Sequence, residues 1–124
     1  MSLNDYEPPP RPAAPGDEPA CWDTFFERFE FKDLEPSMQE LLRADIEERD
    51  AHGLEKYGVR LRPRNGRNAL HDLYQEQLDS LVYVVQALQE NLTTDFTSDI
   101  YDLYRRILLT VVNTRRLIRK SEGR

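Results

Sequence analysis

Two pairs of acidic residues in this 124-residue chain share the spacing acid-x-x-acid. The first pair is Asp45 and Glu48, and the second is Glu76 and Asp79. Residues three apart in an α-helix lie on the same side, so each pair would present two carboxylates together. Carboxylate oxygens are ligands that Mg²⁺ prefers in proteins. Two antiparallel helices would therefore bring four metal ligands around one or two Mg²⁺ ions, with Mn²⁺ able to substitute.

The first pair lies in a segment whose helical pattern has an apolar side. Asp45 shares that side with Met38, Leu41 and Leu42, and Glu48 lies at its edge. A carboxylate on the core-facing side of a helix is costly unless it is paired or binds a metal. We therefore expect Asp45 to face the core and to hold a cation.

The second pair belongs to a longer acidic stripe. Asp72, Glu76, Asp79 and Tyr83 fall within about 60° of one another on a helix, with no Lys or Arg among them. Like charges at this spacing repel each other, and a divalent cation would remove that cost. A solvated acidic face opposite the apolar stripe explains the same spacing, so both interpretations stay open.

A basic segment separates the two acid pairs. Arginine binds phosphate through two parallel hydrogen bonds, and lysine binds it as a point charge. The Asn65-Gly66 turn would let the backbone approach a ligand closely. A polyphosphate held between Mg²⁺ and this segment fits both features, although no Walker loop is present. The alternatives are a solubilising loop, or one that pairs with acids of a neighbouring subunit. The cations are Lys56, Arg60, Arg62, Arg64 and Arg67.

The hydrophobic pattern predicts an all-α fold. Apolar residues recur at helical spacing over a short aromatic-rich segment, 21–31, and over three long ones, 37–57, 68–91 and 98–120. Ser37 and Glu40 have the spacing of a capping box, and Gly53 and Gly58 both offer a stop to the first long helix. We expect a bundle of three long helices plus a short N-terminal helix, completed by oligomerisation.

Composition separates a tail from one domain. Residues 1–20 hold six of the eight prolines and are expected to form a flexible tail, which leaves 21–124 as the domain. The net charge of −6 argues against broad nucleic-acid binding. The apolar runs are too short to span a membrane, and no signal peptide is visible. With a single cysteine, a cytoplasmic location is expected.

The stretch 45–88 resembles the MazG-like, all-α nucleoside triphosphate pyrophosphohydrolases, in particular short members carried by bacteriophages. The resemblance rests on ERDAHGLEKYG (48–58), NGRNAL (65–70) and DLYQEQLDSLVY (72–83), about a third of the chain. The family has EExxE on one helix and ExxD on the next. The second motif is kept as Glu76-x-x-Asp79, whereas the first reads Ala44-Asp45-x-x-Glu48 and so lacks one acid.

The resemblance implies a Mg²⁺-dependent hydrolase that cleaves a nucleoside triphosphate between the α and β phosphates, giving a monophosphate and pyrophosphate. It implies a homodimer or homotetramer, and a role in bacterial or phage nucleotide-pool control. A purine deoxynucleotide, dGTP or dATP, is the expected substrate by analogy.

The same resemblance assigns expected roles to individual residues. The catalytic residues would be Glu48, Asp72 and Glu76, with Glu48 or Asp72 orienting the attacking water. The metal ligands would be Asp45, Glu48, Glu76 and Asp79. Phosphate would be bound by Lys56, Arg64 and Arg67. Sugar or base contacts are expected from Asn65, Asn68 and Tyr83. Trp22 lies outside the resembling stretch and is a further candidate because its ring could stack on a base, although aromatic residues at helical spacing are more often core.

Two other functions are compatible with the residues. The first is a non-catalytic helical interaction protein, which the charged helix faces and the Pro-rich segment favour. The second is a nucleic-acid-binding phage protein that uses the basic stretches 60–67 and 115–124. The net charge of −6 makes this second alternative the weaker one.

Overall fold

The structure is a computed structural model that describes residues 18–123. In this range the chain forms helices and no β-strand, which confirms the predicted all-α class. The described residues divide into two compact units, 18–67 and 68–123. In chain order the elements are α1 (Cys21–Arg28), the 3₁₀ helix η2 (Glu30–Asp33), α2 (Pro36–Tyr57), α3 (Ala69–Glu90) and α4 (Thr97–Ser121).

The N-cap of α2 lies two residues earlier than the capping box predicts. Pro36 occupies the first helical position, and Glu35 is the extended N-cap residue. The hydroxyl of Ser37 donates to the Glu35 carboxylate, so Ser37 does not cap the helix and the capping-box prediction is wrong. Of the two predicted stops, Gly53 and Gly58, the helix uses Gly58. Its φ of 76° is left-handed, and its N–H donates to the carbonyl of Leu54 at 2.8 Å.

An aromatic cluster forms the core of the first unit. Phe31 is 1 % exposed, and its ring lies 5.7 Å from that of Phe25 and 4.8 Å from that of Phe26. From α2, the guanidinium of Arg43 lies 4.2 Å from the Phe26 ring centroid. The aromatic segment thus contacts α2 through the side chain of Arg43.

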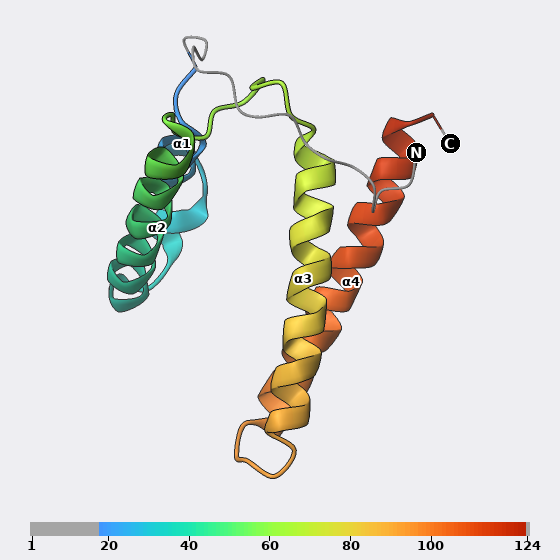
Figure 1. Ribbon diagram of the computed structural model, residues 1–124. Helices are drawn as coiled ribbons and strands as arrows, with labels where there is room; N and C mark the ends of the chain where they lie inside the picture. The colour runs from blue at the N-terminus through green and yellow to red at the C-terminus, as the bar shows by residue number, and fades with distance from the viewer. Residues whose placement is uncertain (1–17, 124) are drawn as a thin grey trace. The chain divides into compact units, whose positions relative to one another are not determined.

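The second unit is an antiparallel hairpin of α3 and α4 (Figure 1). Val84 on α3 and Val111 and Ile118 on α4 are buried. The connection 91–96 is held by side-chain bonds at both ends. The amide of Asn91 donates to the Ala87 carbonyl at 2.7 Å, and the Thr97 hydroxyl donates to the Asn91 carbonyl.

Much apolar surface in the described range is not covered. The buried hydrophobic residues are few, whereas large exposed side chains occur on every long helix. The completion of the bundle by oligomerisation stays a prediction. The most exposed examples are Leu41 on α2, Val82 and Tyr83 on α3, Leu92 in the connection, and Leu109 on α4.

No helix within residues 18–123 combines the length and the apolar content that a membrane crossing needs. The predicted Pro-rich tail, residues 1–20, lies almost wholly outside the described residues.

Candidate functional site

The acid pair of α3 is exposed and has no cationic partner in the described part of the chain. Glu76 and Asp79 both face solvent, and neither carboxylate takes part in an ion pair or a hydrogen bond among residues 18–123. Asp72, on the same stripe, is half-buried and is engaged with another group. The stripe therefore carries two carboxylates that are available to a ligand.

The register of α3 places this stripe beside the hairpin contact. Asn68 caps the helix by accepting from the His71 N–H at 3.2 Å, which sets where the first turn begins. Val84 is buried, and Glu76 lies about 80° from it around the helix. Glu76 therefore borders the packed side, whereas Asp79 lies about 140° from Val84 and so away from it. Tyr83 continues their stripe with 66 % of its surface exposed.

The acid pair of α2 does not face the core of its unit. Asp45 and Glu48 are both exposed, so the expectation that Asp45 is a core-facing carboxylate is wrong. The buried position is its neighbour Ile46, at 6 % exposure, about 100° away around the helix. The apolar residues of α2 are spread around the helix. Arg43 and Asp50, which lie on the side of Ile46, contact the aromatic cluster and Arg60.

The donor set fits a cation that shares its ligands with a substrate. Among residues 18–123 no three His, Cys, Asp or Glu side chains lie together as a metal-binding group. Mg²⁺ usually keeps several waters and binds through one or two carboxylates plus substrate phosphates. Glu76 and Asp79 on α3, or Asp45 and Glu48 on α2, offer two exposed carboxylates each. Each pair suits such a site, and neither makes a closed protein cage.

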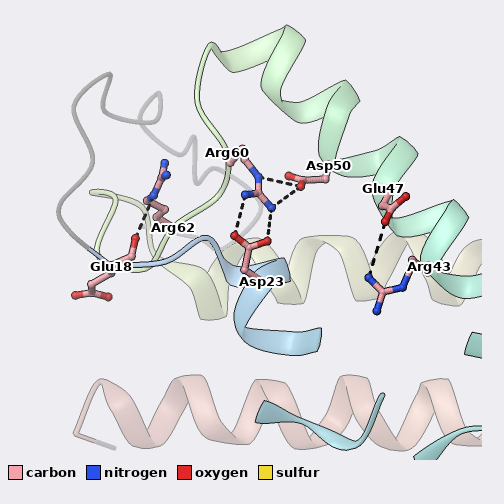
Figure 2. A network of polar contacts seen from close by, with 7 residues as sticks. All are labelled: Glu18, Asp23, Arg43, Glu47, Asp50, Arg60 and Arg62. Carbon is pink, nitrogen blue, oxygen red and sulfur yellow. Dashed lines mark hydrogen bonds and ion pairs between the residues drawn. The ribbon is translucent and has the colours of Figure 1, made fainter. Parts of the chain in front are cut away.

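Arg60 is fully engaged inside its own unit (Figure 2). Its guanidinium donates to both oxygens of Asp23 on α1, at 2.9 and 2.8 Å, and to Asp50 on α2 at 2.9 Å. The hydrogen bond from Arg60 holds the pKa of the Asp23 carboxyl below its ordinary value. In return, the two carboxylates raise the pKa of the guanidinium. Arg60 is thus a structural clamp between α1, α2 and the basic segment.

Two further arginines, Arg62 and Arg64, contact Glu18. Arg62 donates to the main-chain carbonyl of Glu18 at 3.1 Å, and Arg64 binds both carboxylate oxygens of Glu18. Arg64 has a φ of 54°, the one left-handed non-glycine conformation among residues 18–123. The structure therefore places the predicted phosphate ligand Arg64 against a carboxylate of its own chain.

The other predicted phosphate ligands differ in exposure. Lys56 is exposed in the last turn of α2, with its ammonium 5.2 Å from the Tyr57 ring centroid. Arg67 is half-buried and engaged with another group. Lys56 is therefore the more accessible of the two.

The predicted sugar and base ligands have local structural partners. Asn65 accepts from the Arg67 N–H at 3.1 Å, and Asn68 is the N-cap of α3. Trp22 is half-buried, edge-on to Phe25 with 5.6 Å between centroids. Asn68 and Tyr83 are the exposed members of this group, and Asn68 is engaged as the cap of α3.

Sequence reasoning missed the acids that bind the basic segment, namely Glu18, Asp23 and Asp50. It considered acids of a neighbouring subunit, whereas the structure supplies acids from the same chain. The contact between Asp23 and Arg60 joins residues 37 positions apart, so the spacing of residues within one helix or loop cannot predict it. The surplus of arginines in one loop was the available signal, since buried or clustered cations need counter-charges.

Comparisons with protein-family models, with curated proteins and with solved structures find no match for this chain.

Proposed function

We propose that the protein is a Mg²⁺-dependent nucleoside triphosphate pyrophosphohydrolase. The observation that carries the proposal is the exposed pair Glu76 and Asp79, whose carboxylates have no cationic partner among residues 18–123. Two like charges one turn apart gain nothing from each other, and a bound cation would offset their repulsion. The basic segment supplies the counterpart that a polyphosphate needs, and the motif resemblance supports the same reaction.

The metal would be held by Glu76 and Asp79, or by the other exposed pair, Asp45 and Glu48. When bound, Mg²⁺ or Mn²⁺ polarises the phosphate and lowers the pKa of a bound water. The chain's own residues supply the remaining functions. Glu48 or Asp72 orients the attacking water by accepting its hydrogen bond.

The cationic residues act on the leaving group in this proposal. Water adds to the α-phosphorus while the bond to the oxygen that bridges the α and β phosphates breaks. The products are a nucleoside monophosphate and pyrophosphate. Lys56, Arg64 and Arg67 would neutralise the charge that develops on pyrophosphate. Arg60 is not among them, because Asp23 and Asp50 already occupy its guanidinium.

The nucleoside end of the substrate would be read by Tyr83, with Asn65, Asn68 and Trp22 as further contacts. Tyr83 continues the acidic stripe of α3 and is exposed, so its ring is available for stacking on a base. A purine deoxynucleoside triphosphate, dGTP or dATP, is the proposed substrate. The role would be control of the nucleotide pool in the bacterial or phage-infected cytoplasm.

Self-association is part of the proposal. Large apolar side chains of α2, α3 and α4 are exposed, including Leu41 at 63 % and Leu109 at 60 %. Burial of apolar surface is the main favourable term in subunit association. A homodimer or homotetramer would cover these helix faces and complete the bundle.

A pyrophosphate-release assay tests the proposed reaction. The full chain is assayed with the eight common nucleoside and deoxynucleoside triphosphates, with and without Mg²⁺. We expect Mg²⁺-dependent release, and a loss of more than about a hundredfold in Glu76→Gln and in Asp79→Asn. Asp102→Asn, an exposed acid on α4, is the matched control and keeps its activity. Absence of release with every substrate, or equal activity in all variants, contradicts the proposal.

The exposed apolar surface also favours a second function, that of a non-catalytic helical interaction protein. In that case the α3 stripe is a solvated face, and the helix faces bind another protein. This function predicts that binding of the other protein does not depend on metal and is unchanged in Glu76→Gln. The release assay therefore separates the two functions directly.

A further inference from the structure

The segment 18–23 runs alongside the basic loop 60–64 in opposite direction. Asp23 binds Arg60, the Cys21 N–H donates to the Leu61 carbonyl at 2.8 Å, and Glu18 contacts Arg62 and Arg64. Later residues of segment 18–23 therefore contact earlier residues of the loop, and earlier residues contact later ones. Figure 2 shows the inner part of this arrangement.

The arginines at the two ends differ in exposure. At the inner end, the side chain of Arg60 is 30 % exposed, and those of its two partners, Asp23 and Asp50, are 48 % and 19 % exposed. At the outer end, the side chain of Arg64 is 77 % exposed and that of Glu18 is 36 % exposed. Solvent-exposed ion pairs contribute little to stability. The outer pair can therefore open while the inner clamp keeps the loop in place.

We propose that Glu18 is a built-in competitor for the anion site of Arg64, so that a polyphosphate binds only by displacing its carboxylate. This inference rests on the proposed phosphate-binding role of Arg64. The Nε and Nη2 atoms of Arg64 both donate to Glu18, and this fork is the group that binds phosphate in two-bond geometry. One set of donors cannot serve both anions at once.

The left-handed backbone of Arg64 supports a role beyond a chance surface contact. Its φ of 54° is costly for a residue with a side chain, and Gly66, two residues on, is also left-handed with a φ of 84°. The turn brings the guanidinium to Glu18 at the end of the loop. A polyphosphate carries several negative charges, so it would displace Glu18 more readily than a singly charged anion.

Calorimetric titration with inorganic tripolyphosphate, without divalent cations, tests the proposal on the full chain. Glu18→Gln removes the charge but keeps the main-chain carbonyl that Arg62 contacts. Glu27→Gln, an exposed acid on α1, makes the same change in net charge. We expect Glu18→Gln to tighten tripolyphosphate binding about two- to fivefold and Glu27→Gln to leave it within error.

The double variant identifies the partner. Arg64→Gln should weaken tripolyphosphate binding, and adding Glu18→Gln to it should produce no further change, because the two residues share one interaction. Equal affinities in the wild type, Glu18→Gln and Glu27→Gln would overturn the proposal. So would a Glu18→Gln effect that persists in the Arg64→Gln background, or no tripolyphosphate binding by any variant.

These outcomes are distinct from those of the hydrolysis assay. Tighter binding in Glu18→Gln without pyrophosphate release from any nucleotide leaves the competition standing and removes the enzyme proposal. Pyrophosphate release from a nucleotide, together with equal tripolyphosphate affinities of Glu18→Gln and Glu27→Gln, leaves the enzyme proposal standing and removes the competition.

Discussion

Arg60 joins α1, α2 and the basic segment through a single guanidinium group. Its hydrogen bonds to Asp23 and Asp50 are charge-assisted, and Asp50 is largely shielded from solvent. We expect Arg60→Gln to lower the melting temperature by about 5 °C, because it leaves two acids without their counter-charge. Arg106→Gln on the exposed face of α4 is the control and should change it by less than about 2 °C. Thermal melts followed by circular dichroism measure both.

The clamp has a defined pH dependence. The hydrogen bond from Arg60 depresses the pKa of Asp23 in the folded state. A depressed carboxyl pKa contributes stability that is present above the unfolded pKa, about 3.9, and that is lost as pH falls through the folded value. The difference in melting temperature between the wild type and Arg60→Gln should therefore be constant from pH 5 to 7 and shrink below about pH 4. A difference that grows on acidification would contradict this assignment.

Arg64 combines a side chain with a proposed function and a left-handed backbone conformation that is costly in free energy. Arg64→Ala and Arg64→Gly both remove the contact with Glu18, and they differ only in how they tolerate a φ of 54°. We expect Arg64→Gly to be more stable than Arg64→Ala by about 1 kcal/mol, because glycine has no Cβ to oppose the left-handed region. Urea unfolding of the two variants compares them directly. Equal midpoints would show that the turn relaxes to another conformation.

At the residue scale, the sequence predicts side-chain neighbours along one helix better than neighbours across the chain. The stripe of Glu76, Asp79 and Tyr83 follows from the helical period and is present as expected. The partners of Arg60 and Arg64 could not be predicted, because they depend on how residues 18–23 return to the loop. The expectation for Asp45 was wrong for a related reason, since Ile46 and not Asp45 is the buried residue, and the long-range contacts of Arg43 and Asp50 lie on its side of α2.

At the scale of elements, the helix bounds were predictable because their signals are local. The left-handed Gly58 ends α2, and Asn68 caps α3. The hydrophobic period predicted the contact stripe of the hairpin only in part, because it placed Leu117 on the apolar side of α4 whereas Ile118 is the buried residue. The N-cap of α2 was missed by two residues, because Pro36 takes the first helical position and so moves Ser37 inside the helix.

Adjacent residues on α4 provide a test of the hairpin. Ile118 is 0 % exposed, whereas its neighbour Leu117 is 49 % exposed. We expect Ile118→Ala to cost about 2–5 kcal/mol, since it removes buried methyl groups and leaves a cavity. Leu117→Ala should cost less than about 1 kcal/mol at concentrations where the chain is monomeric. Chemical denaturation gives both values, and equal costs would contradict the assigned helix face.

At the scale of the whole molecule, the sequence predicted oligomerisation but not which apolar residues are left exposed. Hydrophobic spacing cannot tell a face that packs within one chain from a face that packs between chains. In the structure, Val82 and Leu109 remain about 60 % exposed on the α3–α4 hairpin. Helical hairpins with two apolar sides commonly pair into four-helix arrangements.

We predict that the full chain sediments as a dimer or tetramer at micromolar concentration. Leu109→Lys should weaken the association by at least about tenfold, because it places a charge in an apolar contact. Asn113→Lys, one turn away and exposed, introduces the same charge at a polar position and should weaken it less. A monomeric wild type in analytical ultracentrifugation would contradict the proposed oligomer.

The most direct test of the proposed site is Mn²⁺ binding in the presence of a dGTP analogue with a methylene group between its α and β phosphates. The analogue cannot be cleaved, so binding is measured apart from turnover. Electron paramagnetic resonance should show that the wild type removes free Mn²⁺ only when the analogue is present, with affinity lowered more than about tenfold in Glu76→Gln and Asp79→Asn. Asp102→Asn should bind like the wild type. Mn²⁺ binding that is absent, or that is equal in all four proteins, would contradict the assignment of this pair as the metal site.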